Sequence, residues 1–368
     1  MKKKVMPVLQ KLGQSLMLPL AVMPAAGLLN RFGSADLLNI PLLTSAGSAI
    51  ISNMGILFAI AVAIGFAEES GVAGLAGVVG YYVTIGVAQS FDASIDIGVF
   101  GGIVIGILAG ILYNKFHNFR VPEILAFFGG KRFVPIITSL VGVLLGVFFG
   151  IAWPVIQNSL NNFGAWLISL GSIGPTIFMI INRLLLPFGL HHIPNNYVFF
   201  QLGSFVNDGA TITGEISRFF SGDPTAGSFL VGFFPIMMGG YPGAALAMAK
   251  VSKPENRKVI TSMMISLALT SFLTGITEPI EFSYTFVAPL LFVINIIFSA
   301  VSAFICNILG LTAGFTFSAG LIDYILGFGL SHKPIMLLIL SGIYFILFYF
   351  SFKFLIKKFN LPTPGREE

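Results

Sequence analysis

Three long stretches of this chain carry no charged side chain. Residues 37–67, 133–182 and 282–322 contain no Asp, Glu, Lys or Arg. Each stretch is longer than the roughly 20 apolar residues that cross the hydrocarbon core of a bilayer as a helix. Transmembrane strands would alternate polar and apolar residues, and residues 290–303 do not alternate. The pattern therefore predicts an all-α, polytopic membrane protein.

The composition supports this class and limits the partners. Only 10% of the residues are charged, against roughly 25% in soluble domains, and the mean hydropathy is +0.93. The net charge of +5 does not indicate nucleic-acid binding, because the basic residues border apolar runs instead of forming one hydrophilic face. The single cysteine, Cys306, lies in an apolar segment, so a packing role is expected and no disulfide within one chain is possible.

The basic residues set the expected orientation. They gather in four clusters, at residues 2–11, 115–132, 250–258 and 353–358. The positive-inside rule places all four in the cytoplasm, with both termini inside and an even number of about ten spans. Residues 1–160 are expected to form five ordinary spans. Among these, the Gly-rich span 72–88 should approach another helix or another subunit closely.

Several boundaries follow from the apolar runs and from Gly, Pro and polar residues. The first span should be kinked at Pro19 and Pro24, and an external linker should separate the fifth span from the second half. The expected segments are a first span at 12–29, a crossing at 49–67, a linker at 157–164, a marginal span at 312–328 and a last span at 334–354.

The second half, residues 161–358, differs because two of its apolar segments are interrupted. One break follows Arg183 at Pro187, and residues 198–205 beyond it are too short to span. The other lies at residues 275–282, which read Gly-Ile-Thr-Glu-Pro-Ile-Glu-Phe. Paired Gly/Pro breaks point to a transporter binding site near the bilayer midplane, so two re-entrant hairpins are expected.

The first break collects candidate binding residues. Arg183 is the sole charge in residues 133–207, which is costly unless it faces a cavity or a carboxylate, the alternative being a charge that reaches an interface. His191 and His192 can bond a sugar hydroxyl or balance a phosphoryl group, and at most one of them is expected to face a given site. Asn195 and Asn196 follow as further polar contacts. Adjacent histidines chelate poorly, so neither a metal nor a cofactor is expected.

The second break supplies two carboxylates and a hydroxyl. Because proline disfavours helix at the residue before it, Glu278 is expected on non-helical backbone. Its carboxylate could accept a hydroxyl proton as a general base or orient the hydroxyl. Glu281 and Thr277 lie beside it, and an ion pair with Arg183 is the structural alternative. Asp323 is either a proton-relay acid or a capping residue, and the cap is the favoured interpretation.

Four motifs together resemble a known family. They are His191-His192 followed by Asn195, Gly-Asp-Pro-Thr-Ala-Gly at 222–227, the stretch at 275–282, and Thr-Pro-Gly-Arg-Glu at 363–367. This order resembles the membrane-embedded IIC (EIIC) component of the phosphoenolpyruvate-dependent sugar phosphotransferase system (PTS), glucose superfamily. Residues 232–238 and 360–367 look most like its N-acetylglucosamine branch, with the glucose and maltose branches as alternatives.

The resemblance implies a mechanism and partners. Glu278 and His191 would contact the sugar hydroxyl that becomes phosphorylated, with Arg183 nearby. The donor would be a phosphocysteine on an EIIB domain or subunit, and residues 359–368 would be a cytoplasmic tail that leads toward it. A homodimer formed through the first five spans is implied, embedded in lipid of a bacterial plasma membrane. A proton-coupled sugar carrier with Glu278 and Asp323 as relay acids is the rival, and a channel is disfavoured because no filter-like repeat is present.

Overall fold

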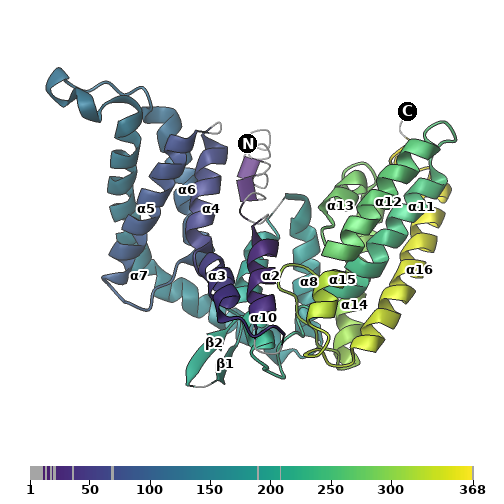
Figure 1. The fold of residues 1–368 in the computed structure, drawn as a ribbon. Coiled ribbons are helices and arrows are strands. Elements are labelled where there is room, and N and C mark those ends of the chain that lie inside the picture. Colours follow the sequence, from purple (N-terminus) through teal and green to yellow (C-terminus); the bar gives the residue numbers. More distant parts are fainter. Residues whose placement is uncertain are drawn as a thin grey trace. The chain divides into compact units, whose positions relative to one another are not determined.

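The structure of the chain is a computed structural model that describes residues 11–12, 15–16, 19, 22–34, 37–67, 70–188, 190–207 and 209–366. It contains two compact units, residues 1–162 and 163–368, and their boundary falls inside α7 (Phe133–Ser169) (Figure 1). The first basic cluster lies largely outside the described residues, as do Glu68 and Glu69, and the expected first span at 12–29 is described only in part.

The N-terminal unit is helical, and its helices pack through small residues. A Cβ on Gly102 would lie 2.0 Å from the carbonyl oxygen of Gly55, so α6 and α4 touch backbone to backbone. A Cβ on Gly77 would lie 2.7 Å from the carbonyl oxygen of Ala59, so the close approach predicted for residues 72–88 is made to α4. The helices besides α7 are α2 (Met23–Gly33), α3 (Pro41–Ser52), α4 (Met54–Phe66), α5 (Gly71–Gln89) and α6 (Gly98–Phe116), with the 3₁₀ turns η1 (Glu123–Phe128) and η2 (Gly130–Arg132).

Two boundary predictions in this unit are wrong. The crossing expected at 49–67 is broken at Asn53, where α3 and α4 meet at a bend of 51°. The linker expected at 157–164 is helical throughout, inside α7. The polar side chains there bond along the helix: Gln157 Nε2 donates to Asn161 Oδ1 at 3.1 Å, and Ser159 Oγ donates to the carbonyl oxygen of Val155 at 2.8 Å. Local polarity therefore did not end the helix.

The C-terminal unit holds the interrupted segments. The elements up to residue 251 are α8 (Ile173–Leu185), η3 (Leu186–Phe188), α9 (His192–Phe200), β1 (Ser204–Asn207), β2 (Ala210–Thr213), α10 (Glu215–Phe220), the π-helix η4 (Pro235–Gly240) and α11 (Tyr241–Val251). Those that follow are α12 (Arg257–Thr274), α13 (Glu278–Thr285), α14 (Pro289–Ile308), α15 (Leu321–Leu326) and α16 (Pro334–Lys358). In Figure 1, α11, α12, α14 and α16 lie side by side.

The prediction of a purely helical fold needs one correction. Strands β1 and β2 form a two-stranded antiparallel hairpin, with Phe205 opposite Ile212. The hairpin turns at Gly209, whose φ of +79° is costly for residues with a side chain. The polar stretch at residues 204–213 thus forms a β-hairpin within a helical unit.

The marginal span expected at 312–328 is also wrong. Only α15, six residues long, is helical in that stretch. The buried carboxylate of Asp323 accepts hydrogen bonds from the backbone N–H and hydroxyl of Thr316, at 2.6 and 2.7 Å, and from the backbone N–H of Ser318, at 3.3 Å. These bonds hold residues 316–318 as a loop. Asp323 does not cap a helix as expected, because α15 begins after Gly320 and has no side-chain capping bond.

The membrane class is clear from the long helices. Five described helical segments are long and apolar enough to cross a bilayer, or six if the bent pair α3–α4 counts as one span. They include α16, which matches the last span expected at 334–354, and α14, which lies inside the charge-free run 282–322. The chain is therefore a multi-pass helical membrane protein.

Candidate functional site

The break between α12 and α13 is built by two glycines. Gly275 ends α12 with φ +73° and its carbonyl oxygen accepts a hydrogen bond from Ser318 Oγ at 3.0 Å. A Cβ on Gly320 would lie 2.5 Å from the carbonyl oxygen of Leu273, so the loop before α15 presses against the end of α12. Non-helical backbone at membrane depth is tolerated where protein surrounds it in this way.

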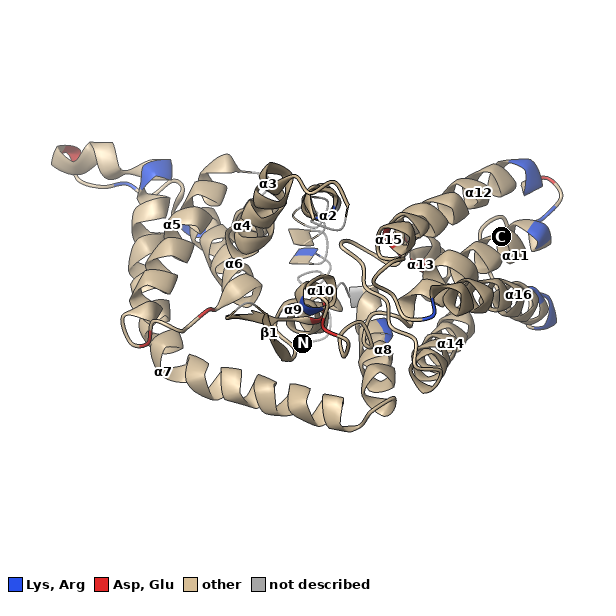
Figure 2. Cartoon of the chain, turned by 60° about the horizontal axis from the view of Figure 1, so that its bottom comes forward, with Lys and Arg blue, Asp and Glu red and all other residues tan. Residues whose placement is uncertain are grey.

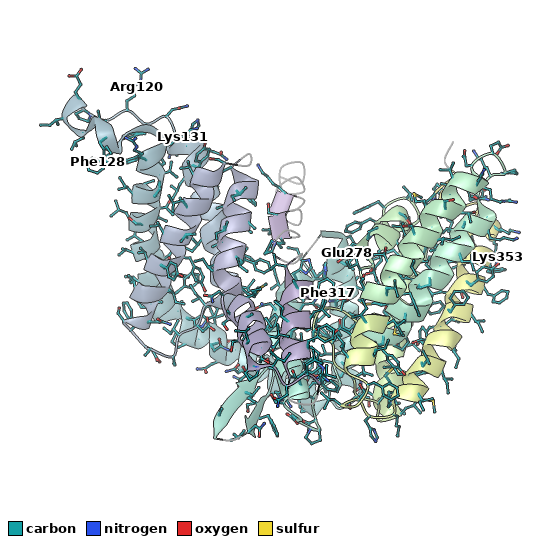
Figure 3. The ribbon with its side chains drawn as sticks, viewed as in Figure 1. Arg120, Phe128, Lys131, Glu278, Phe317 and Lys353 are labelled. Atoms are coloured by element: carbon teal, nitrogen blue, oxygen red, sulfur yellow. The ribbon has the colours of Figure 1, made fainter. Side chains whose placement is uncertain are left out.

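Glu278 lies at the exit from this break. The sequence placed it on non-helical backbone, but the break covers only residues 275–277 and Glu278 is the first residue of α13 (Figure 3). Pro279 is tolerated directly after it because the first helical turn needs no N–H donor. The half-buried carboxylate accepts a hydrogen bond from the backbone N–H of Thr277 at 3.1 Å. Most of its capacity to accept hydrogen bonds therefore remains for another donor.

Glu281 lies one turn further and is fully buried. Arg183 Nη1 contacts its Oε1 at 2.8 Å, and the two side chains are 1% and 0% exposed. Thr277 Oγ1 donates to the same oxygen at 2.8 Å, and Asn295 Nδ2 donates to the other at 3.0 Å. Three donors from α8, the break and α14 thus satisfy this carboxylate. The expected ion-pair alternative for Glu281 is realised in the structure.

Arg183 is only partly satisfied by that pair. Its Nε and Nη2 are buried and have no hydrogen-bond partner among the described residues. The guanidinium carbon of Arg183 lies 5.2 Å from the ring centre of Phe233 and 5.7 Å from that of Tyr241. Aromatic ring faces attract a cation, so both contacts stabilise the charged guanidinium. Arg183 therefore combines a fixed position with N–H groups that a ligand could still use.

The double histidine lies at the start of α9. His191 precedes the helix and is buried, and its Nδ1 has no partner in the described part of the chain. The ring centres of His191 and His192 lie 3.8 Å apart, so the two imidazoles contact each other. Asn195 Oδ1 accepts from Asn182 Nδ2 at 2.6 Å, which ties α9 to α8, and Asn196 is half-buried beside it in sequence.

Arg183 links the two breaks. Its positive charge lies near enough to act electrostatically on both Glu278 and His191. The C-terminal unit therefore brings Arg183, Glu281 and Thr277 into direct contact, with Glu278 and His191 around them. Sequence reasoning missed Asn182 and Asn295. Asn295 had a signal, because it is the single amide in the apolar run 290–303.

A second charged cluster lies in the same unit, outside the long membrane-capable segments. Arg218 bonds Asp223 through Nε, at 2.8 Å, and through Nη2, at 2.7 Å. Its Nη1 reaches Glu215 and the carbonyl oxygen of Leu202, and Thr225 completes the set. Burial raises the pKa of Glu215 to about 7, against the lowering effect of N–H donors and Arg218. Asp223 and Thr225 belong to the Gly-Asp-Pro-Thr-Ala-Gly motif, which therefore stabilises a turn.

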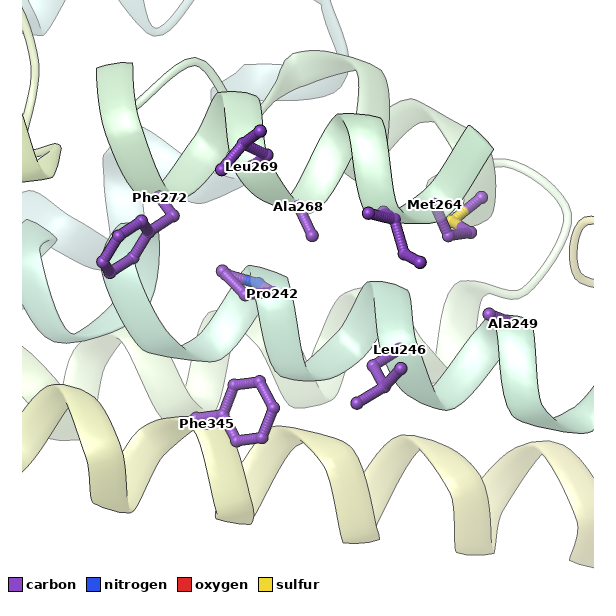
Figure 4. A pocket seen from close by; sticks show the side chains of 9 residues that line it. Pro242, Leu246, Ala249, Met264, Ala268, Leu269, Phe272 and Phe345 are labelled. Atoms are coloured by element: carbon purple, nitrogen blue, oxygen red, sulfur yellow. The ribbon is translucent and has the colours of Figure 1, made fainter. Parts of the chain in front are cut away.

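A cavity in the C-terminal unit does not suit a sugar. It measures about 270 Å³ and lies between α11, α12 and α16 (Figure 4). Only apolar side chains line it, among them Leu246, Met264 and Phe345. A sugar needs hydrogen-bond partners for its hydroxyls, because unpaired buried polar groups are costly. The polar groups around Glu278 are the better candidate.

These features define a class: a multi-pass helical membrane protein with carboxylates, an arginine and histidines gathered at two helix breaks. The family model "Phosphotransferase system, EIIC" matches residues 13–300. The N-acetylglucosamine-specific EIICB component of Bacillus subtilis is 47% identical over 98% of this chain and 79% of its own length. The chain therefore belongs to the phosphotransferase system EIIC family.

Other relatives agree with this assignment. The N-acetylglucosamine-specific EIIC component of Streptomyces coelicolor is 46% identical over 98% of this chain and 92% of its own. The N-acetylglucosamine-specific EIICBA component of Escherichia coli is 46% identical over 98% of this chain, which spans 56% of that relative. The solved structure of ChbC, the IIC component of the N,N'-diacetylchitobiose-specific phosphotransferase system, covers 97% of both chains at 17% identity and a TM-score of 0.62, and shares the fold.

Proposed function

We propose that this chain binds N-acetylglucosamine, moves it across the membrane and presents its 6-hydroxyl to phosphorylated EIIB. It would be the membrane component of a sugar phosphotransferase. The observation that carries the proposal is Glu278, a half-buried carboxylate with spare acceptor capacity at the start of α13, beside a buried arginine with unpaired N–H groups. Three relatives at 46–47% identity named as N-acetylglucosamine-specific support the sugar.

Glu278 and His191 are the proposed contacts of the reacting hydroxyl. The phosphoryl group would leave the EIIB cysteine sulfur and bond to the sugar oxygen, and the hydroxyl proton would pass to the Glu278 carboxylate. A general base must lie within hydrogen-bond reach of that proton. Negative charge on the transferring group would be balanced by nearby cations, as phosphoryl transfer requires. Arg183 would supply such a cation, and the imidazoles of the histidines can donate hydrogen bonds to the transferring group.

The other predicted residues have supporting roles in this proposal. Glu281 and Thr277 hold Arg183 in place, so their contribution to sugar binding is largely through position. Asn195 keeps α9 against α8 through Asn182. His192 contacts His191 and Asn196 is half-buried, so both remain available for sugar hydroxyls. This division of roles separates groups that touch sugar from groups that position them.

The membrane arrangement is part of the same proposal. Ten crossings, with re-entrant hairpins at α8–α9 and α12–α13, suit helices such as α8 and α13 that are shorter than the roughly 20 residues of a full span. Residues 1–160 would serve as scaffold and homodimer interface, residues 161–358 would carry the sugar, and both termini would be cytoplasmic. The relatives' names EIICB and EIICBA support EIIB as partner.

The rival carrier mechanism finds less support. It needs Asp323 as a proton relay, but that carboxylate is buried and holds a loop through bonds to Thr316 and Ser318. A relay acid must exchange its proton readily, whereas breaking these bonds would free the loop. The phosphotransferase interpretation makes no such demand on Asp323.

Glu278→Gln tests the role of the carboxylate in reconstituted vesicles supplied with phosphorylated EIIB. We expect loss of N-acetylglucosamine phosphate formation by at least about 100-fold, because the amide cannot accept the proton. Glu123→Gln, at an exposed carboxylate of η1, is the matched control and should form product at the normal rate. Normal product formation by Glu278→Gln would refute the assignment.

Competition binding tests the sugar. Radiolabelled N-acetylglucosamine bound to purified protein should be displaced by unlabelled N-acetylglucosamine at far lower concentrations than by glucose or maltose. Displacement by glucose or maltose at equal or lower concentrations would move the chain to one of those branches while leaving the EIIC assignment intact.

A further inference from the structure

The last described residues, 360–366, do not leave the protein as a free tail; we call them the strap. At Asn360 the backbone enters the left-handed region, with φ +47°, directly after α16. The backbone N–H of Leu361 donates to the carbonyl oxygen of Ile356 at 3.1 Å, which turns the chain back. Thr363 is 0% exposed, and Pro364 and Gly365 are buried.

The strap is bonded to the turn at residues 252–256 that joins α11 and α12. The backbone N–H of Lys253 donates to the carbonyl oxygen of Gly365 at 3.0 Å. Arg366 Nη1 donates to the carbonyl oxygen of Val251 at 2.9 Å. Gly365 has φ +77°, and a Cβ there would lie 2.7 Å from Ile260 Cγ1, so only glycine fits without strain. The strap is therefore fixed to α11, α12 and α16 together.

Basic side chains surround the strap. Figure 2 shows Lys and Arg at the ends of α11, α12 and α16 near the described C-terminal end. The exposed ones, which we call the basic rim, are Lys250, Lys253, Arg257, Lys258, Lys357 and Lys358. Among the described residues of the turn, Glu255 is the one acid, and in the sequence Glu367 and Glu368 follow the strap. The rim is thus a positively charged surface beside the fixed strap.

We propose that the strap and the basic rim form the docking surface for phosphorylated EIIB. The inference rests on the proposed function, because it names where the phosphoryl donor of that function binds. A phosphocysteine is anionic, and a basic surface raises the association rate of an anionic partner. The relatives named EIICB and EIICBA carry EIIB in the same polypeptide. A strap held in one place would therefore hold the start of their EIIB at a fixed position.

The strap favours a protein partner over anionic lipid as the occupant. Lipid headgroups need only exposed cations, and their binding makes no use of a strap fixed by backbone hydrogen bonds. A tethered domain gains from such an anchor, because a defined starting point keeps its effective concentration at the surface high. Because the strap is already ordered before EIIB binds, docking does not have to bear the entropic cost of ordering it.

The test uses the full chain in nanodiscs with the EIIB part of the Bacillus subtilis relative, purified separately and phosphorylated. In the rim variant, Lys250, Lys258 and Lys357 are all changed to Gln. We expect the KM for phosphorylated EIIB to rise about tenfold with N-acetylglucosamine affinity unchanged, because steering is lost. Gly365→Val should raise the same KM about fivefold, because the displaced strap must be ordered again on docking.

A charge-matched control separates docking from general electrostatics. Changing Lys115, Arg120 and Lys131 to Gln removes the same charge from exposed sites of the N-terminal unit. This control should leave the KM within twofold of the parent, and an equal rise in both triple variants would overturn the proposal. So would an unchanged KM in the rim variant or in Gly365→Val.

Two further outcomes test whether anionic lipid occupies the rim and whether the proposed function itself holds. A rim effect that vanishes in nanodiscs of purely zwitterionic lipid would assign the rim to anionic headgroups and overturn the docking role. Failure of the parent chain to bind N-acetylglucosamine would instead refute the proposed function, and it is measured without EIIB. If Gly365→Val no longer binds sugar, Arg366→Met replaces it as the test variant. Arg366→Met keeps the backbone unchanged and is expected to show the same rise in KM.

Discussion

Two buried arginines of the C-terminal unit differ in how completely they are paired. Arg218 uses every guanidinium nitrogen, on Asp223, Glu215, Thr225 and the carbonyl oxygen of Leu202. Arg183 uses only Nη1, on Glu281, and keeps Nε and Nη2 unpaired among the described residues. Both are almost fully buried. Burial alone therefore does not separate a structural arginine from a functional one.

The two clusters differ in whether they contain hydrogen-bonding groups that still lack a partner. A fully satisfied polar network rigidifies the fold, whereas an unpaired buried donor costs free energy that a ligand could recover. The Arg218 cluster closes the turn at residues 222–227, and nothing in it remains for a ligand. The Arg183 cluster lies beside Glu278 and His191, which also have spare hydrogen-bonding capacity. We infer that the first cluster stabilises and the second binds.

Arg218→Met should give the largest loss of stability. The substitution leaves Glu215 and Asp223 without their cation, and breaking a buried pair costs about 3–5 kcal/mol. We expect the upper end of that range, measured as the free energy of unfolding in detergent, because two carboxylates lose their partner. The folded fraction should bind N-acetylglucosamine with unchanged affinity. A weakened affinity for N-acetylglucosamine at low temperature, where the variant is folded, would show that Arg218 also affects binding and would contradict the comparison.

Arg183→Met should cost less stability but also weaken sugar binding. Glu281 would keep its donors Thr277 and Asn295, so we expect about 3 kcal/mol, the lower end of the range. Sugar affinity should fall in the same variant, measured by equilibrium binding.

The double variant Arg183→Met with Glu281→Leu sharpens this prediction. Replacing a buried ion pair by apolar residues is often neutral for stability. The free energy of unfolding should therefore return close to that of the parent protein. Sugar affinity should stay low. Recovery of both properties would show that Arg183 is structural, as Arg218 is.

Asp323→Asn should have a moderate effect that is confined to stability. An amide retains one acceptor oxygen, so part of the bonding to Thr316 and Ser318 is lost, at a cost of about 1–3 kcal/mol. Sugar uptake per folded molecule should be unchanged, whereas a proton relay would lose uptake. Asp92→Asn, at an exposed carboxylate, is the control and should alter neither measurement.

Gly275→Ala should have the smallest of these effects on stability, about 1–2 kcal/mol, because a side chain is strained at φ +73°. The added Cβ would lie 2.6 Å from Ser318 Oγ, so we expect the break to shift and sugar affinity to fall slightly. Gly342→Ala, in α16 with open space around it, should leave affinity unchanged. Equal behaviour of both variants would argue that the shape of the break does not matter.

The sequence predicted what depends on local pattern. Charge-free runs located α14 and α16, and Gly and Pro located the break before Glu278. The extent of α7 was not predictable, because Gln157 and Asn161 bond each other along a helix that polarity alone suggested would end. The hairpin β1–β2 had a signal that was missed, because Asp-Gly at 208–209 is a typical hairpin turn and residues 210–213 alternate apolar and polar.

The candidate site was predictable in its members but not in its pairing. Arg183 and Glu281 are 98 positions apart, and nothing in their local sequence says that they meet. An arginine in an apolar run signals only that some partner is required. Which carboxylate pairs with it and which remains available depends on tertiary packing, and the structure pairs Glu281 while leaving Glu278 half-buried.

The chemical form of the delivered sugar tests the central claim most directly. Vesicles containing the chain would be given labelled N-acetylglucosamine outside and phosphorylated EIIB inside, with and without a proton gradient. The account predicts sugar phosphate inside only when phosphorylated EIIB is present, with no dependence on the gradient. Free sugar that accumulates with the proton gradient and without EIIB would contradict it.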